Sequence, residues 1–253
     1  MGRVIAIANQ KGGVAKTTTA VNLGASLALR GKRVLVVDID PQGNASSGLG
    51  VDRLKVKGCI YDVLINGVPM EQVIVETKVE NLYVVPATIR LAGAEIELVS
   101  AISRELKLKK ALTPIKDKFD FILIDCPPSL GLLTLNALTA ADRILIPIQC
   151  EYYALEGLGQ LMNTIKLIKK HLNPDLELEG VVLTMFDART NLSIQVVDEV
   201  KQYFKNKVFK TIIPRNVRLS EAPSHGEPVV TYDPKSRGAE VYKELAGEIL
   251  ENG

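Results

Sequence analysis

The stretch NQKGGVAKTTT, residues 9–19, joins a short apolar run to a segment with helical periodicity. The ordinary phosphate-binding loop reads G-x-x-x-x-G-K-[ST], and Lys16 with the threonine that follows it fits the end of this pattern. However, Gln10 stands at the first glycine position, Ala15 precedes the lysine, and Lys11 stands where the pattern requires nothing. The loop alone is therefore compatible with a damaged nucleotide site, a different kind of site, or a turn rich in small residues.

Outside this loop, short runs rich in β-branched residues alternate with stretches of helical periodicity. The runs are Val4–Ala8, Val34–Val37, Leu82–Val85, Phe121–Ile124, Ile144–Ile148, Val181–Met185 and Val208–Ile213. The helical stretches are about 16–31, 90–99, 104–117, 131–141, 153–171, 193–204 and 238–250. Continuously apolar runs are typical of strands buried on both faces. The alternation predicts an α/β fold with a doubly wound, mostly parallel β-sheet flanked by helices, in a single domain over residues 1–253.

Composition excludes several classes of protein. Of the 253 residues, 47% are hydrophobic and 24% charged, which is ordinary for a folded globular chain. The net charge is only +2, so nucleic-acid binding would require a local basic patch. The three cysteines are far apart, and they predict buried thiols in a reducing cytoplasm. We find no signal peptide, and no apolar run reaches the roughly 20 residues of a membrane span.

Polar and glycine-rich segments follow the predicted strands at one edge of the sheet. They are residues 9–19, 38–44, 125–129, 151–157 and 187–191. Ligands of doubly wound sheets bind beyond the carboxyl ends of the strands, so these segments are expected to form one site.

The residue types in these segments suit phosphate and magnesium chemistry. Backbone N–H groups at a glycine-rich turn and a helix N-terminus attract an anion. Lys16 would place a positive charge on the β- and γ-phosphates, and the Thr17 hydroxyl would ligate Mg²⁺. Asp125, Asp38 and Asp40 end two apolar runs, where a carboxylate of a magnesium site is usual. Each aspartate alone also fits a simple strand-end turn.

The run from Lys11 to Thr18 resembles the deviant Walker A loop of the ParA/MinD class of P-loop ATPases, whose members carry an additional lysine near the start of the loop. The resemblance implies ATP and Mg²⁺ as cofactors, and a homodimer when ATP is bound. It also implies that Lys11 reaches the phosphates of the other subunit. The residues implied to contact nucleotide are Lys11, Gly12, Gly13, Val14, Ala15, Lys16, Thr17 and Thr18.

The resemblance extends along essentially the whole chain. VDIDPQGNASSGLG resembles a second acidic motif of the class, which implies that Asp40 orients the attacking water and lies near the metal. FILIDCPPSLG resembles the Mg²⁺-side motif and implies Asp125 as a metal residue. IPRNVRLSEAPSHGEP is similar to the chromosomal ParA proteins called Soj, and it implies that Pro214 and Asn216 line the adenine end. The catalytic residues implied are Lys11, Lys16 and Asp40, in an ATPase of slow intrinsic turnover.

Ala15 is a departure from this family pattern, which has glycine before the lysine. If the backbone angle φ is positive at this position, an L-residue costs on the order of 1 kcal/mol or more. A loss of ~1.4 kcal/mol is a tenfold loss of affinity. Weaker ATP binding or slower dimer closure is one hypothesis. The other is that the alanine is harmless, because φ is negative or because the loop relaxes.

The resemblance also implies nonspecific binding to double-stranded DNA, and the charge distribution gives this expectation a place. Between Phe186 and Arg218 the basic residues are Arg189, Lys201, Lys205, Lys207, Lys210, Arg215 and Arg218, and the acidic ones are Asp187, Asp198 and Glu199. Such a cluster, doubled in a dimer, would bind phosphates through counterion release. We predict Arg189 and Arg218, both in loop-like contexts, and less strongly Lys201 and Lys205. Each of these alone also fits a solvated surface charge.

The resemblance implies a ParB-like centromere-binding partner that stimulates hydrolysis, and a location at the nucleoid in the cytoplasm. We expect no N-terminal DNA-binding extension and no membrane contact. The acidic stretch Ile60–Val99 is one place where a basic partner peptide could bind. A second basic run, Arg104–Lys118, is predicted to be a helix with an exposed basic face and no assigned role. A MinD-like membrane-cycling ATPase and a metabolic enzyme on the same loop are the alternative functions.

Overall fold

The computed structural model describes residues 2–151 and 158–252. Its strands form an eight-stranded sheet in the order β3-β4-β2-β5-β1-β6-β7-β8. The strands are β1 Arg3–Ile7, β2 Val34–Asp38, β3 Val75–Glu76, β4 Leu82–Val85, β5 Phe121–Asp125, β6 Arg143–Gln149, β7 Glu177–Phe186 and β8 Val208–Pro214. Every pairing is parallel except that of β3 with β4. This confirms the predicted fold class and adds a short antiparallel edge strand that the sequence did not reveal.

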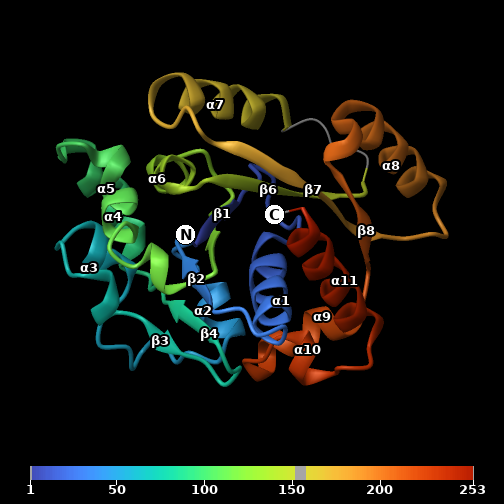
Figure 1. Ribbon diagram of the computed structural model, residues 1–253, viewed down its shortest axis with the longest axis horizontal. Helices are drawn as coiled ribbons and strands as arrows, with labels where there is room; N and C mark the ends of the chain where they lie inside the picture. The colour runs from blue at the N-terminus through green and yellow to red at the C-terminus, as the bar shows by residue number, and fades with distance from the viewer. Residues whose placement is uncertain (1, 152–157, 253) are drawn as a thin grey trace.

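Helices cover both faces of this sheet. The α-helices are α1 Lys16–Ala28, α2 Asn44–Gly48, α3 Ile60–Leu64, α4 Leu91–Glu97, α5 Lys107–Leu112, α6 Leu132–Ala140, α7 Leu158–His171, α8 Asn191–Phe204, α9 Val217–Glu221, α10 Val229–Tyr232 and α11 Arg237–Glu251. Apolar residues of α3 to α8 pack in one core and those of α1, α2 and α9 to α11 in the other. Figure 1 shows α1 and α11, the first and last helices of the chain, side by side on the same face.

The sheet brings the predicted site segments to one edge. In the register of the central strands, Ile7 of β1 and Asp38 of β2 both pair with Asp125 of β5. The carboxyl ends of these three strands therefore lie at the same level, and the loops that follow them meet. The strand order reverses direction at β1, which makes this strand a topological switch point. Open α/β sheets bind their ligands outside the carboxyl ends of the strands at such a point.

One prediction about secondary structure needs correction, and another is tested only in part. The basic run Arg104–Lys118 is not one helix: it consists of a 3₁₀ turn at Arg104–Leu106, helix α5, and a second 3₁₀ turn at Lys116–Lys118. Thr113 and Pro114 lie between α5 and the second turn, and the proline ring excludes the preceding residue from a regular helix. Of the helix expected over 153–171, residues 153–157 lie outside the described part of the chain.

The two outer strands present little free backbone. β3 has only two residues. On the opposite side, the carboxylate of Glu248 in α11 accepts hydrogen bonds from the backbone N–H groups of Lys210 (2.8 Å) and Thr211 (2.7 Å) in β8. Among the helices of the described residues, none combines the length and the apolar character required to cross a bilayer.

Candidate functional site

The loop between β1 and α1 is held in place by two buried polar side chains. Asn9 accepts a hydrogen bond from the N–H of Lys11 at 3.0 Å and donates one to the carbonyl of Pro147 at 2.7 Å. From β7, the Thr184 hydroxyl donates to the carbonyl of Val14 at 3.1 Å. The loop is thus tied to two strands of the sheet. Asn9 and Thr184 were missed in the sequence because neither stands at a position that the loop pattern specifies.

Ala15 has a left-handed backbone, with φ 68° and ψ 32°, and Gly13 has φ 73°. Glycine adopts this region freely, whereas an L-residue with a Cβ costs roughly 1–2 kcal/mol there. Ala15 is also the N-cap of α1, and its carbonyl accepts the N–H of Thr19 at 2.9 Å. The condition under which Ala15 should be costly is therefore met. A negative φ, one of the two ways in which the alanine would be harmless, is excluded.

Lys16 begins α1 and points back into its own loop. Its side chain is largely buried, with 6% of the residue exposed, and its Nζ donates to the carbonyl of Lys11 at 3.0 Å. Burial lowers the pKa of Lys16, and the carboxylates of Asp125 and Asp40 oppose that shift. A buried ammonium held by a single carbonyl has donor capacity left for an anion, since an ammonium carries three N–H donors.

Asp125 ends β5 at the floor of the site. It is fully buried, and neither of its carboxylate oxygens has a hydrogen-bond partner within residues 2–151 and 158–252. Burial, followed by the charge of Asp38, raises the pKa of Asp125 well above its usual range, and the nearby Thr17 hydroxyl and Lys16 oppose this. Buried polar groups are normally paired, so two orphan oxygens require an explanation.

Asp38 is also fully buried, but it is fully engaged. It accepts hydrogen bonds from the N–H (2.8 Å) and hydroxyl (2.7 Å) of Ser46 and from the N–H of Asp40 at 3.2 Å. Burial, partly offset by these bonds, raises the pKa of Asp38 to about 6. Asp38 thereby fixes the loop that carries Asp40, a role that the sequence did not assign to it.

Asp40 is nearly buried, and its Oδ1 accepts the N–H of Gln42 at 2.9 Å. Together the Thr17 hydroxyl, the orphan carboxylate of Asp125 and the carboxylate of Asp40 form a set of hard oxygen donors around Lys16. This donor set fits a magnesium ion carried with phosphates, because Mg²⁺ prefers one or two carboxylates plus phosphate oxygens. The residues present therefore fit the predicted metal.

A cavity of 410 Å³ opens beside the end of this loop. Ala15 and Thr18 line it on one side, and Pro214 and Asn216 on the other, with the buried Tyr242 of α11. Its volume falls within the usual range of 300–1,000 Å³ for small-molecule sites. The structure thus brings Pro214 and Asn216 next to the phosphate loop, as the prediction requires of a nucleoside end. Tyr242 was missed because its helix lies far along the chain.

Comparison with known proteins agrees with this geometry. The profile of the AAA-domain family matches residues 2–178. The Bacillus subtilis sporulation initiation inhibitor protein Soj is 67% identical over 253 residues, which is all of both chains. The chromosome-partitioning ATPase Soj of Treponema pallidum is 55% identical, over 99% of this chain and 98% of its own.

The chain belongs to the ParA/Soj family of chromosome-partitioning ATPases. The resemblance found in its motifs is therefore confirmed. Among solved structures, a Mycobacterium smegmatis protein named cobyrinic acid a,c-diamide synthase, with bound ADP and magnesium, has a TM-score of 0.88 and 42% identity, covering 99% of this chain and 95% of its own. The phosphate loop and the Asp125 strand of this ParA/Soj-family chain lie within the matched AAA domain.

Lys11 lies at the rim of the site in this ParA/Soj-family chain. Its side chain lines a second cavity of 470 Å³, together with Asp187, Thr190 and an ion pair between Arg215 and Glu151. Lys16 does not line this second cavity, although its ammonium group binds the Lys11 carbonyl. The reach of Lys11 to another subunit stays a prediction.

The four predicted DNA-binding residues differ in their surroundings. Arg189 lies in a turn, with its side chain 88% exposed, and forms a two-pronged ion pair with Asp187 (2.9 and 2.7 Å). Arg218 is not in a loop: it lies in α9 and pairs with Glu221 at 2.8 Å and Asp233 at 3.1 Å. Asn216 begins that short helix by accepting the N–H of Arg218 at 2.9 Å, which the sequence pattern did not reveal.

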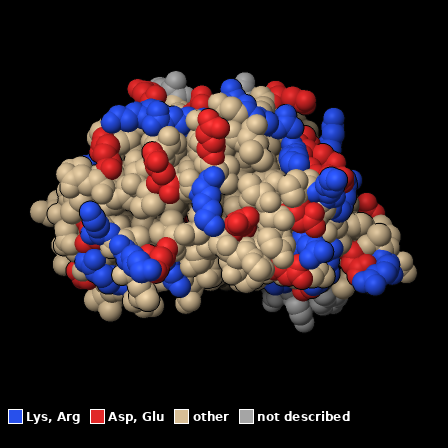
Figure 2. Space-filling model, turned by 90° about the horizontal axis from the view of Figure 1, so that it is seen from below, with Lys and Arg blue, Asp and Glu red and all other residues tan. Residues whose placement is uncertain are grey.

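Lys201 lies in the last turn of α8, and Lys205 follows the helix with φ 52°. Figure 2 shows the molecule from the side of β3, β4 and α10, where basic and acidic side chains are interspersed and form no large patch of one sign. We therefore do not place the DNA-binding surface on that face.

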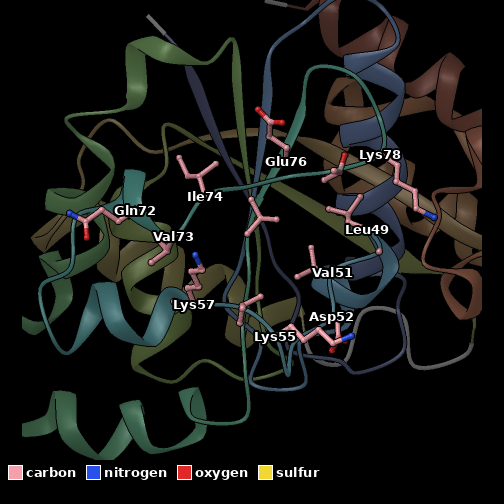
Figure 3. A pocket seen from close by; sticks show the side chains of 15 residues that line it. Leu49, Val51, Asp52, Lys55, Lys57, Gln72, Val73, Ile74, Glu76 and Lys78 are labelled. Carbon is pink, nitrogen blue, oxygen red and sulfur yellow. The ribbon is translucent and has the colours of Figure 1, made fainter.

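A larger cavity of 570 Å³ lies elsewhere, between residues 49–58 and the β3 edge. Figure 3 shows Val51, Val73 and Ile74 in it, with Lys55 and Lys57 nearby. None of the predicted site residues lines this cavity, which therefore has neither the loop amides nor the carboxylates of the phosphate site. Its size therefore does not make it the nucleotide site.

Proposed function

We propose that this chain is an ATP-gated switch in the segregation of chromosomal or plasmid DNA. ATP with Mg²⁺ closes a homodimer, the dimer holds double-stranded DNA without sequence preference, and hydrolysis releases it. The observation that carries the proposal is the orphan carboxylate of Asp125 beside the buried Lys16. Such an arrangement is costly in an empty site and is compensated by a bound magnesium–phosphate group.

Each side chain has a role in this proposal. Lys16 and the loop amides bind the β- and γ-phosphates. Thr17, Asp125 and Asp40 would hold Mg²⁺, which neutralises charge on the transferred phosphoryl group. Asp40 also orients the attacking water, and the bonds from Asp38 to Ser46 and to Asp40 keep its loop in position. Pro214 and Asn216 enclose the base and ribose.

Lys11 is proposed to act in trans. In a dimer whose two subunits face each other at this edge, the ammonium of Lys11 would lie next to the γ-phosphate bound by the other subunit. Negative charge spreads over that phosphate in the transition state, and the ammonium would stabilise it. Without this second lysine, turnover would be slow. Separately, the left-handed backbone at Ala15 would lower the affinity of the loop for nucleotide.

DNA and a centromere-bound partner complete the cycle. Arg189, Arg218, Lys201 and Lys205 are proposed to contact DNA phosphates in the dimer. A ParB-like protein is proposed to stimulate hydrolysis. Binding to DNA is proposed to locate the chain at the nucleoid. The names of the relatives support the segregation role, since the Treponema pallidum protein is named as a chromosome-partitioning ATPase.

A MinD-like membrane cycle is the weaker alternative. Such proteins attach through a basic amphipathic segment whose apolar face is free to enter the bilayer. In this chain the apolar residues of α11, Val241, Leu245 and Ile249, are buried in the core. Its outward residues include Glu240 and Glu244, which are bound by Arg237. The described C-terminal helix thus has no free apolar face.

The test is DNA binding by the purified protein with ATP, with ADP and without nucleotide. We expect the wild type to bind DNA only with ATP. Lys16→Ala should show no ATP-dependent DNA binding. Lys57→Ala, an exposed lysine beside the other cavity, is the matched control and should behave like the wild type. DNA binding that ignores nucleotide would refute the switch. An ATP turnover that requires cobyrinic acid, and not DNA, would instead indicate the synthase activity for which the Mycobacterium smegmatis protein is named.

A further inference from the structure

Asn216 lies at the junction between a cavity and a short helix. The 410 Å³ cavity beside the phosphate loop, which Ala15, Thr18, Pro214 and Asn216 help to line, is called the nucleoside cavity. β8 ends at Pro214, and the N–H of Arg215 still donates to the Phe186 carbonyl of β7 at 3.1 Å. The next residue, Asn216, accepts the N–H of Arg218 on its Oδ1 at 2.9 Å. One side chain thus lines the cavity and holds the backbone of Arg218.

Helix α9 depends on this cap. It has only five residues, Val217–Glu221, and a helix of that length is not stable by itself in water. The first N–H groups of a helix have no partner within it, and an asparagine cap shifts the helix equilibrium about fivefold relative to alanine. The cap oxygen is itself confined by α11, because a Cβ added to Gly238 would lie 3.2 Å from Oδ1 of Asn216 and 3.0 Å from Cγ of Leu219.

The same helix separates the nucleoside cavity from charged side chains. Its first and third residues, Val217 and Leu219, line the cavity. Arg218, between them, does not line it and pairs with Glu221 at 2.8 Å and with Asp233, just after α10, at 3.1 Å. Figure 1 shows α9 and α10 next to each other below α11. A change in the first turn of α9 would therefore move Arg218.

Arg189 lies on another wall of the same cavity. In the register of the sheet Phe186 of β7 pairs with Pro214 of β8, so residues 187–190 and 215–218 leave the sheet at the same level. Arg189 lines the nucleoside cavity although its side chain is largely exposed. Two residues proposed to contact DNA, Arg189 and Arg218, thus belong to segments that bound the place proposed for the base and ribose.

We propose that Asn216 is a positioning residue that couples the nucleoside cavity to Arg218 within one subunit. A base and ribose in the cavity would restrict the Asn216 side chain to the orientation in which its oxygen caps α9. The helix would then hold Arg218 in place for a DNA phosphate. The amide group of Asn216 also carries two N–H donors, which the cap does not use and which suit the acceptor nitrogens of a purine. The inference rests on the proposed function and adds a route inside each subunit.

The first experiment follows the backbone N–H of Arg218 by hydrogen exchange, without DNA. The free protein is compared with protein saturated with ADP or with pyrophosphate, each with Mg²⁺, because pyrophosphate lacks the base and ribose. ADP should slow the exchange of this N–H about fivefold, and pyrophosphate should leave it unchanged. In Asn216→Ala the effect of ADP should be lost. Equal exchange with ADP and with pyrophosphate would overturn the inference and leave the proposed function standing.

The second experiment measures DNA affinity over a range of salt, with a slowly hydrolysed ATP analogue at saturation. Asn216→Ala should weaken binding about fivefold and reduce the salt slope, as Arg218→Ala does. The double variant should bind like Arg218→Ala alone, because residues that act as one unit are not additive. Asn216→Ser should bind like the wild type, since serine is an equally good cap.

Ser236→Ala is the matched control. Ser236 is the N-cap of α11 and accepts the N–H of Ala239 at 3.2 Å, but it does not line the nucleoside cavity. Its loss should lower the melting temperature and leave DNA affinity unchanged. If it weakens DNA binding as much as Asn216→Ala, loss of any cap suffices and the inference is wrong. The inference is equally wrong if the losses in the double variant add.

Failure of the proposed function would look different. In that case neither the wild type nor Ala15→Gly would bind DNA with the ATP analogue, and the inference would fall with it.

Discussion

The ammonium group of Lys16 donates to the main-chain carbonyl of Lys11 at 3.0 Å. The two lysines of the loop are thus linked through the backbone of one and the side chain of the other. Removing the Lys11 side chain leaves this bond intact. Lys11→Ala should therefore keep ADP binding, whereas Lys16→Ala should lose it.

With ATP the Lys11→Ala variant should fail to dimerise, and its partner-stimulated turnover should fall by about 10³-fold, the scale of a charge supplied in trans. Titration calorimetry for ADP and a phosphate-release assay check both parts. Full turnover in Lys11→Ala would show that the lysine has no part in the chemistry.

Replacing Ala15 by glycine should increase nucleotide affinity. The left-handed backbone at this residue, φ 68°, costs an L-residue roughly 1–2 kcal/mol, and relief of ~1.4 kcal/mol on binding is a tenfold change. Fluorescent ATP-analogue titration of the chain and of Ala15→Gly measures this directly. Lys205, which also has positive φ (52°) but lies away from the loop, provides the control Lys205→Gly. Equal affinity of the Ala15→Gly variant and the parent would mean that the strain is the same in the bound and free loop.

The buried carboxylates make the nucleotide-free protein less stable as the pH rises. The folded-state pKa values of Asp38 (about 6) and Asp125 are raised above their unfolded values, so the folded state binds more protons. Their stabilising contribution is complete below pH 4 and is lost as the pH rises through 6 and beyond. Asp125→Asn should therefore raise the melting temperature by several degrees at pH 8 and by less at pH 5.

Melting curves at the two pH values check this prediction. Asp187→Asn is the control, because the pKa of Asp187 is lowered to about 2 by Arg189 and its sign is opposite. Magnesium with an ATP analogue should stabilise the wild type and not Asp125→Asn. A uniform shift at both pH values would exclude burial of the charge as the cause.

The ion pair with Asp187 partly neutralises Arg189 and so competes with its binding of a DNA phosphate. Asp187→Asn keeps the shape of the side chain and removes its charge, so it should increase DNA affinity several-fold. Arg189→Ala should decrease affinity and reduce the slope of log affinity against log salt by about 1. Fluorescence anisotropy with a duplex of arbitrary sequence, over a range of salt, measures both. If neither change alters DNA affinity, this turn lies outside the DNA surface.

The central part of the fold could be predicted from sequence because buried parallel strands are continuously apolar. The runs Phe121–Ile124 and Leu82–Val85 were placed within one residue of β5 and β4. What escaped prediction is short or tertiary in origin. β3 has two residues and exists only through its pairing with β4. The short helix α9 depends on the cap supplied by Asn216.

The candidate site shows the same division. Residues in the loop pattern, such as Lys16 and Thr17, were predictable because phosphate chemistry fixes their type and spacing. Asp38 and Thr184 act through contacts with Ser46 and Val14, which are made only once the strands are aligned.

Both outer strands of the sheet are protected from other chains. β3 is too short to serve as a template, and the N–H groups of Lys210 and Thr211 in β8 are occupied by the Glu248 carboxylate. Free edges are the usual starting point for runaway fibre growth in β-rich proteins. Because β3 is short and these two N–H groups are occupied, neither edge of the sheet offers a long row of free backbone groups to a strand of another copy.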